Sequence, residues 1–197
     1  MSADLRAWVG LVLAAITLAG CGGSRPSFKN TDVTGADYGR DFALTDHTGK
    51  ARTLADFRGK VVVMFFGYTR CPDVCPTTLA ELKAVKDQLG EDGKRLQVLF
   101  VTVDPERDTQ SLLANYVPAF DPSFLGLFGD SAATARVAKD FRVFYQKSPG
   151  KTPDGYTVDH TAGSYVFDPQ GRLRLFARHG NAANLAADVR ILLKATS

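Results

Sequence analysis

A run of six apolar residues, Val61 to Phe66, constrains the fold of this chain more than any other feature. A strand that is apolar at consecutive positions must be buried on both faces, as in the centre of a parallel sheet. A segment from Pro76 to Gly90 follows, and its apolar residues recur at helical spacing. A buried strand followed by an amphipathic helix predicts a βα unit and therefore an α/β fold.

The chain on either side continues this alternation. Residues 41–54 hold two short alternating segments around a turn with Asp and Gly, which predicts a β-hairpin. Residues 96–103 predict a second buried strand, and a Pro/Gly turn at 168–171 predicts an antiparallel pair formed by its flanks. Further helices are expected at 109–116, 131–141 (with Ser131 as N-cap) and 181–194. A short strand is expected at 124–127, and extended segments are expected at 143–146 and 158–167.

This order of elements is that of a thioredoxin-like α/β sandwich. It predicts a mixed central sheet, with the hairpin at 41–54 as an N-terminal extension. Hydrophobic residues make up 45% of the 197 residues, which is enough for one sizeable core. The formal net charge is +3 and the charges are interspersed, so the composition does not support nucleic-acid binding.

The N-terminus has the pattern of a targeting segment. The uncharged apolar run from Ala7 to Gly20 is short for a membrane span but suits the hydrophobic region of a signal peptide. Leu18-Ala19-Gly20-Cys21 resembles the bacterial lipobox, in which the cysteine is lipidated and becomes the mature N-terminus. An ordinary secretory signal with a chance cysteine is the alternative.

These features predict a lipoprotein held at the extracytoplasmic, periplasmic face of a bacterial membrane through a lipid on Cys21. Residues 22–37 are polar, with Gly, Ser and Pro, and are expected to form a flexible tether. The expected division is a signal peptide at 1–20, a tether at 21–37 and a domain at 38–197.

Cys71 and Cys75 are the two cysteines that remain after the lipid-bearing one. They lie between the buried strand and its helix, the place where this architecture carries its chemistry. Because Cys75 precedes Pro76, it is expected to cap the helix, and the helix N-terminus should lower the thiol pKa values. Two close thiolates suit Cu(I), and the same spacing also permits a disulfide or a redox pair.

His160 is the histidine expected near the cysteine pair, because the loop entering the strand at 164–167 faces the cysteine turn in a thioredoxin-like fold. Thioredoxin has a cis-proline there, whereas this chain has Asp-His-Thr. His47 and His179 are expected to be surface residues, with a capping role as the alternative for His179.

Three motifs together resemble the Sco (SenC/PrrC) family of copper metallochaperones. They are Gly67-Tyr68-Thr69-Arg70-Cys71-Pro72-Asp73-Val74-Cys75-Pro76, Val103-Asp104-Pro105-Glu106-Arg107-Asp108-Thr109 and Val158-Asp159-His160-Thr161. The resemblance covers roughly residues 40–195, and the motifs occur in the family's order.

The resemblance implies copper bound through Cys71, Cys75 and His160, as Cu(I) and, in an oxidised state, as Cu(II). It implies delivery to the CuA centre of cytochrome c oxidase subunit II, and a copper donor protein upstream. The family's conserved acidic residue corresponds to Asp104, which is expected near the site or else as a strand-ending turn residue. Asp159 is expected to orient His160 or to be solvated. Many members have a transmembrane anchor, whereas this chain is expected to use a lipid.

Two other functions use the same cysteines. A thiol–disulfide reductase that keeps the CuA-site cysteines reduced would need the pair but not His160, so enzymatic activity stays open. A thiol peroxidase would share the hairpin and the Phe57-Arg58-Gly59-Lys60 segment. Its reactive cysteine is usually single, however, which argues against this class.

Overall fold

The computed structural model describes residues 26–152 and 155–195. The expected signal peptide and the lipidation site Cys21 therefore lie outside the described residues. No helix among the residues described is long and apolar enough to cross a membrane.

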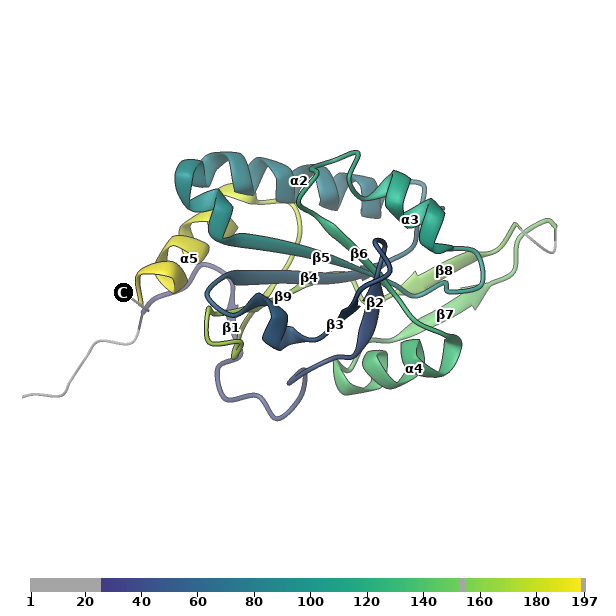
Figure 1. Ribbon diagram of the computed structural model, residues 1–197, viewed down its shortest axis with the longest axis horizontal. Helices are drawn as coiled ribbons and strands as arrows, with labels where there is room; N and C mark the ends of the chain where they lie inside the picture. The colour runs from purple at the N-terminus through teal and green to yellow at the C-terminus, as the bar shows by residue number, and fades with distance from the viewer. Residues whose placement is uncertain (1–25, 153–154, 196–197) are drawn as a thin grey trace, which may run out of the picture.

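A mixed eight-stranded sheet forms the centre of the described part (Figure 1). Strands β4, β5 and β6 are parallel, and β4–β9, β9–β10 and β2–β6 are antiparallel pairs. The arrangement is the thioredoxin-like sheet that the sequence predicts, with the hairpin β2–β3 at one edge. In spatial order the strands are β1 (Thr31–Asp32), β10 (Leu173–Ala177), β9 (Ser164–Phe167), β4 (Val61–Gly67), β5 (Leu96–Thr102), β6 (Leu125–Phe128), β2 (Leu44–Asp46) and β3 (Ala51–Arg52).

Helices cover both faces of this sheet (Figure 1). On one face lie α2 (Val74–Leu89), α3 (Gln110–Tyr116) and α5 (Ala182–Lys194), and on the other lies α4 (Ser131–Asp140). Strand β4 explains the apolar run, since alternate residues enter the two cores: Val63 and Phe65 pack on the α2 side, whereas Met64 and Phe66 pack on the α4 side. Short 3-10 helices occur at η2 (Leu54–Phe57) and η3 (Gly90–Arg95).

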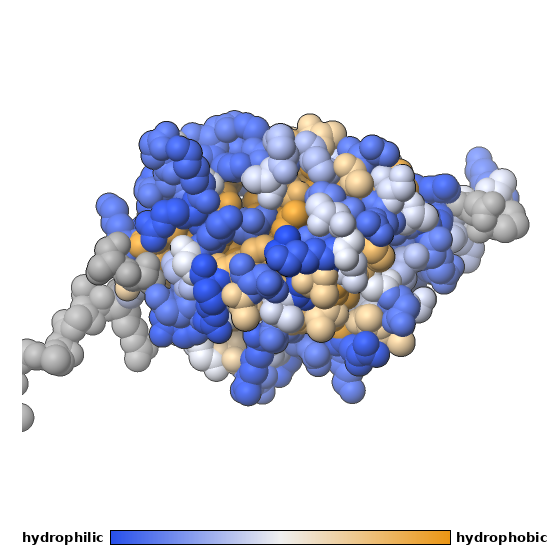
Figure 2. Space-filling model, in the orientation of Figure 1, coloured by the Kyte–Doolittle hydropathy of each residue, from blue (hydrophilic) through white to orange (hydrophobic). Residues whose placement is uncertain are grey.

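The surface view agrees with this two-sided packing. Figure 2 shows hydrophilic residues over most of the visible face, and apolar residues show mainly near its centre, over the sheet. The core therefore lies between the sheet and its helices. Candidate functional residues are expected at the ends of the central strands, outside this core.

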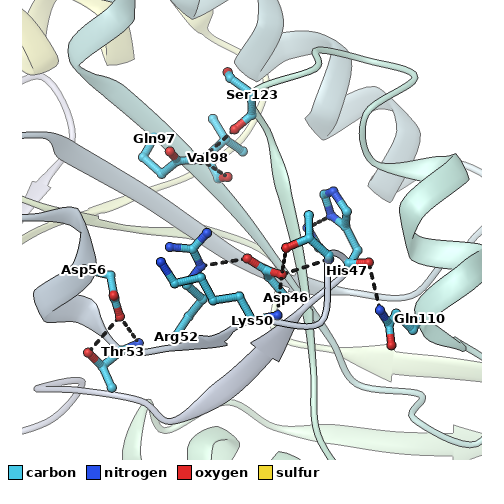
Figure 3. Close-up of polar contacts among 12 residues, drawn as sticks. Asp46, His47, Lys50, Arg52, Thr53, Asp56, Gln97, Val98, Gln110 and Ser123 are labelled. Carbon is cyan, nitrogen blue, oxygen red and sulfur yellow. Dashed lines mark hydrogen bonds and ion pairs between the residues drawn. The ribbon is translucent and has the colours of Figure 1, made fainter.

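The turn of the hairpin β2–β3 is held by a buried carboxylate. Asp46 accepts hydrogen bonds from the backbone N–H groups of Thr48 and Lys50, and from Arg52 Nε at 2.7 Å (Figure 3). These donors lower the pKa of Asp46 to about 2, against the opposing effect of its burial, which is the largest single influence on that pKa. The predicted hairpin thus has its own polar centre, away from the cysteines.

A second, two-stranded sheet is the main departure from the expected elements. Strand β7 (Tyr145–Ser148) pairs with β8 (Thr157–His160), and β8 is separate from β9 (Figure 1). One extended segment over 158–167 was expected. The chain breaks at Gly163, where φ is +145° and a Cβ would lie 2.3 Å from the Phe176 ring. His160 is therefore the last residue of β8, at the base of the β7–β8 hairpin.

Two helix starts also differ from the sequence-based expectation. Helix α2 begins at Val74 with Asp73 as N-cap, so Cys75 lies within its first turn and does not cap it. Helix α4 is capped by Asp130, whose carboxylate accepts from the N–H of Ala133, and Ser131 is its first residue. In both cases a preceding aspartate takes the N-cap position.

Part of the expected tether is fixed to the domain. Thr31 and Asp32 form strand β1 on β10, so the sheet begins before residue 38. The buried carboxylate of Asp188 in α5 accepts from the N–H groups of Lys29 and Asn30, each at 2.8 Å. The side-chain amide of Asn30 is a third donor to this carboxylate. The composition of residues 22–37 does not reveal these contacts, because their acceptor lies in α5.

Candidate metal centre

The cysteines lie where β4 ends and α2 begins. Cys71 follows a tight turn in which its N–H donates to the carbonyl of Tyr68. Cys75 points inward from the first turn of α2 and is fully buried, whereas Cys71 is half-buried. Both are free thiols. One sulfur is therefore accessible and the other lies in the core.

Burial dominates the chemistry of Cys75. Desolvation raises the pKa of its thiol well above its ordinary value, and the neighbouring Cys71 raises it further. The expected lowering by the helix N-terminus is wrong for this residue, because loss of solvent outweighs the helix end. Gly67 makes this packing possible, since a Cβ there would lie 2.8 Å from Cys75 Sγ.

His160 meets Cys75 across 85 residues of sequence. Its Nε2 lies 3.8 Å from Cys75 Sγ, and its Nδ1 lies 3.1 Å from the carbonyl oxygen of Thr161. The geometry assigns the proton to Nδ1, which donates to that carbonyl and leaves the Nε2 lone pair facing the sulfur. Burial lowers the pKa of His160, which favours the neutral imidazole that a metal requires.

Cys71 and His160 line one open cavity of about 320 Å³, together with Tyr68, Pro72 and Val158. Tyr68 packs edge-on against the His160 ring, with centroids 6.2 Å apart. Within the described ranges no three His, Cys, Asp or Glu side chains already stand close enough to hold a metal ion. The fold thus brings Cys75 and His160 together, and Cys71 lines the cavity that His160 also lines.

Asp108 supports the turn that carries Cys71. Its carboxylate is 1% exposed and accepts from Thr69 N–H at 3.0 Å, Thr69 Oγ1 at 2.6 Å and Thr102 Oγ1 at 2.6 Å. Burial raises its pKa, against the lowering effect of these donors. The sequence carries no signal for this role of Asp108, since its partner Thr69 lies 39 residues away and no local pattern connects the two.

Asp104 lies near the site but does not face the cavity. It is fully buried and accepts hydrogen bonds from Arg107 Nε and from the Tyr156 hydroxyl at 2.7 Å. The Arg107 guanidinium also stacks on the Tyr156 ring at 3.5 Å and donates to its carbonyl oxygen at 2.8 Å. Because Tyr156 leads directly into β8, these contacts hold the strand that carries His160.

Of the remaining candidates, Asp159 matches the solvated alternative, whereas the other two histidines differ from the expectation. Asp159 is exposed and accepts from Ser148 Oγ, so the Thr161 carbonyl and not this carboxylate orients His160. His47 and His179 are half-buried and not surface residues. His47 Nδ1 accepts from the Gly126 N–H at 3.0 Å.

His179 joins two elements of the site. Its Nδ1 lies 3.0 Å from Thr78 Oγ1 in α2, and its Nε2 lies 3.0 Å from Ser164 Oγ in β9. It therefore links the cysteine-bearing helix to the strand that follows His160. Both partners are distant in sequence, so the sequence alone carries no signal for this bridge.

This fold and site define a class of thioredoxin-like proteins in which a Cys-x-x-x-Cys pair meets a histidine from a separate hairpin. The chain belongs to the SCO1/SenC family, whose sequence model matches residues 30–194. The resemblance inferred from the three motifs is thus confirmed.

Relatives and solved structures agree with this assignment. Bovine "Protein SCO2 homolog, mitochondrial" is 38% identical over 91% of this chain and 71% of its own length. The human SCO2 homolog is 42% identical over 76% of this chain, but only 58% of the human protein is matched. The structure of Bradyrhizobium japonicum ScoI with copper bound has 43% identity and a TM-score of 0.72, covering 80% of this chain and 99% of that one. Apo Sco1 from Thermus thermophilus has 44% identity and a TM-score of 0.75, covering 86% and 99%.

Proposed function

We propose that this protein binds one copper ion through Cys71, Cys75 and His160 and delivers it to the CuA centre of cytochrome c oxidase subunit II. The observation that carries the proposal is the 3.8 Å approach of His160 Nε2 to Cys75 Sγ, with Cys71 lining the same cavity. The relative from B. japonicum and one from Arabidopsis thaliana were both solved with copper bound, which supports copper as the metal.

The donor set suits Cu(I). Two thiolates and an imidazole are soft or intermediate ligands, and they favour copper over hard cations. Cys71 is half-buried and lines the cavity, whereas Cys75 is buried, so an incoming ligand from a copper donor or from subunit II can reach Cys71 first. Transfer then proceeds by ligand exchange, in which the partner's ligands replace Cys71, His160 and Cys75 one at a time.

Copper loading displaces protons. Because burial raises the pKa of Cys75, its thiol is protonated in the copper-free protein at neutral pH. A metal–thiolate bond requires loss of that proton, whereas His160 is already neutral. Copper affinity therefore falls as the pH falls. Oxidation of the pair to a disulfide removes both sulfur ligands, so loading also depends on the redox state.

A thiol–disulfide reductase for the CuA-site cysteines is the second candidate. The observation that favours it is the contrast between an accessible Cys71 and a buried Cys75. In that reaction Cys71 would attack a substrate disulfide, and Cys75 would resolve the mixed disulfide. The reaction needs both sulfurs but does not use His160.

We also propose that a lipid on Cys21 anchors the protein at the extracytoplasmic, periplasmic face of a bacterial membrane. The lipobox resemblance at residues 18–21 supports the lipid, and the polar segment after it gives the domain some reach. Mass spectrometry of the mature protein tests this directly, since an unmodified Cys21 contradicts the anchor.

Copper titration of the reduced full chain tests the ligand set. The parent should bind one copper per chain, and His160→Ala, Cys71→Ser and Cys75→Ser should each lose stable binding. His47→Ala is the matched control, because that ring bonds to Gly126 and lies outside the candidate set. Copper retention by His160→Ala equal to the parent would contradict the proposal.

The same variants separate the two functions. Disulfide reduction of a CuA-domain substrate should survive in His160→Ala and be lost in both cysteine variants. Rapid reduction by the parent, without copper transfer to the reduced substrate, would make the reductase the primary function.

A further inference from the structure

A cavity lies at the end of the sheet opposite the metal centre. It has a volume of about 550 Å³ and is lined by residues 34–36 and 38–40 of one segment and residues 171–174 of another. The second segment follows the turn after β9, where Phe167 pairs with Val62 at the start of β4. The cysteines follow the other end of β4, so the length of a seven-residue strand, about 20 Å, separates the two sites.

Arginines dominate the charge of this cavity. Arg40, Arg172 and Arg174 line it, and no acidic residue is among its lining residues. Arg172 and Arg174 share a single buried carboxylate, Asp168, whose Oδ2 lies 2.9 Å from Arg172 Nε and 3.1 Å from Arg174 Nη1. Two guanidinium groups with one carboxylate leave an excess of positive charge.

Arg40 adds to that excess. Its side chain makes no hydrogen bond or ion pair with any residue in the described part of the chain. The nearby Arg142 is neutralised by Asp37 at 2.7 Å and stacks on the Tyr38 ring at 4.6 Å. The cavity thus combines unneutralised arginine with apolar walls from Ala36, Tyr38 and Leu173. That combination suits an anionic headgroup attached to a less polar body.

The chain enters the fold beside this cavity. Pro26, the first described residue, lines an adjoining cavity together with Asp32, Thr34 and Arg174, and the last two line both cavities. Pro26 is five positions after Cys21 in the sequence. A fully extended chain covers at most about 3.6 Å per residue, so a lipid on Cys21 holds Pro26 within about 18 Å of its attachment point.

We propose that the arginine cavity binds the phosphate headgroup of an anionic phospholipid in the membrane that holds Cys21. The proposal rests on the lipid anchor proposed above. Guanidinium groups pair with phosphate oxygens in a forked, two-point geometry, and their attraction to anionic headgroups is strongest close to the surface. Binding at this end turns the opposite end of β4, with Cys71 and His160, away from the bilayer.

Hydrogen exchange on the lipid-modified full chain tests this orientation. The protein is reconstituted in vesicles of phosphatidylcholine alone, or of phosphatidylcholine with phosphatidylglycerol. Backbone amides of residues 35–41 and 171–174 should exchange about tenfold more slowly in the anionic vesicles. Arg40→Glu should abolish that difference, whereas Lys83→Glu, the same charge change on α2, should keep it. Copper stoichiometry should be equal in all these samples.

Three other outcomes would each overturn the proposal. Equal exchange in the two vesicle types, or protection that survives in Arg40→Glu, overturns the headgroup site while leaving the anchor intact. Equal protection by inorganic phosphate in phosphatidylcholine vesicles would make it a site for soluble anions and would overturn the lipid assignment. An unmodified Cys21 in the mass spectrum overturns the anchor and this proposal together, without affecting the copper site.

Discussion

The hydroxyl of Tyr156 donates a hydrogen bond to Oδ1 of Asp104 across 2.7 Å, and this contact joins the loop after β5 to the strand that carries His160. Arg107 completes the link, since it pairs with the other oxygen of Asp104 and stacks on the Tyr156 ring. A buried carboxylate with both oxygens engaged acts on the neighbouring backbone more than on a metal. We therefore expect Asp104 to act as a positioning residue for His160, through Tyr156.

Tyr156→Phe should loosen the hairpin without removing a ligand. The ring and its stack on Arg107 remain, and only the hydroxyl bond to Asp104 is lost, at a cost of about 1 kcal/mol in unfolding free energy. Copper affinity should fall, because His160 is less well held. Tyr145→Phe in the adjacent strand β7 is the control and should match the parent.

A double-mutant cycle identifies the route of this effect. If Tyr156 acts through His160, the Tyr156→Phe change should not further lower the weak copper affinity that remains in a His160→Ala background. An equal loss of affinity in both backgrounds would show that Tyr156 acts in some other way.

Gly67→Ala should displace Cys75. The new Cβ would lie 2.8 Å from Cys75 Sγ and 2.9 Å from the Phe100 ring, and both neighbours are tightly packed. Overpacking of this kind costs about 1–3 kcal/mol, measurable by urea denaturation. Alkylation of Cys75 should become faster, as the thiol is pushed from its buried position.

Gly35→Ala is the control for Gly67→Ala. Its Cβ would meet nothing within 4 Å, so only the strain of a φ of +88° remains. Cys75 alkylation should then be as slow as in the parent. Unchanged alkylation of Cys75 in Gly67→Ala would contradict the packing argument.

Asp108→Asn should weaken the turn that carries Cys71. An amide has one acceptor oxygen, whereas the carboxylate receives bonds from Thr69 and Thr102 on both oxygens. The expected loss is about 1–3 kcal/mol of unfolding free energy, together with weaker copper binding. Asp87→Asn, in an exposed pair with Lys83, should change neither quantity. Parent-like copper affinity in a destabilised Asp108→Asn would limit Asp108 to a structural role.

The stability of the copper-free protein should fall on mild acidification, partly because of His179. Burial lowers the pKa of His179 from its ordinary value of 6.5, against the opposing effect of Glu81, while His160 lowers it further. Below pH 6.5 the unfolded state therefore binds more protons than the folded state, and the unfolding free energy decreases as the pH falls. The loss continues until the pH reaches the lowered pKa of the folded protein.

His179→Gln removes this contribution. Denaturation between about pH 7 and about pH 5.5 should show a smaller decrease in unfolding free energy than in the parent. The decrease should not vanish, since burial also lowers the pKa values of His47 and His160. An identical decrease in variant and parent would contradict the buried, neutral state of His179.

The elements that local sequence determines are those whose side-chain pattern reports directly on packing. The run Val61–Phe66 predicted a strand buried on both faces, and the structure buries every residue of β4. The spacing of Leu79, Leu82 and Val85 likewise predicted α2, where all three are buried. Periodicity is set by neighbours a few residues away, so the sequence suffices. The helix starts are predicted less exactly, since Asp73 and Asp130 are the N-caps in place of Cys75 and Ser131.

The burial of the site residues and the approach of His160 to Cys75 depend on the tertiary structure. The sequence placed Cys71 and Cys75 at the end of the central strand, and the family motifs indicated His160 as their partner. Only the fold showed that Cys75 is buried with a raised thiol pKa and that His160 reaches it from a separate hairpin. Burial and charge depend on residues tens of positions away, such as Tyr156 for Asp104, and no local pattern records them.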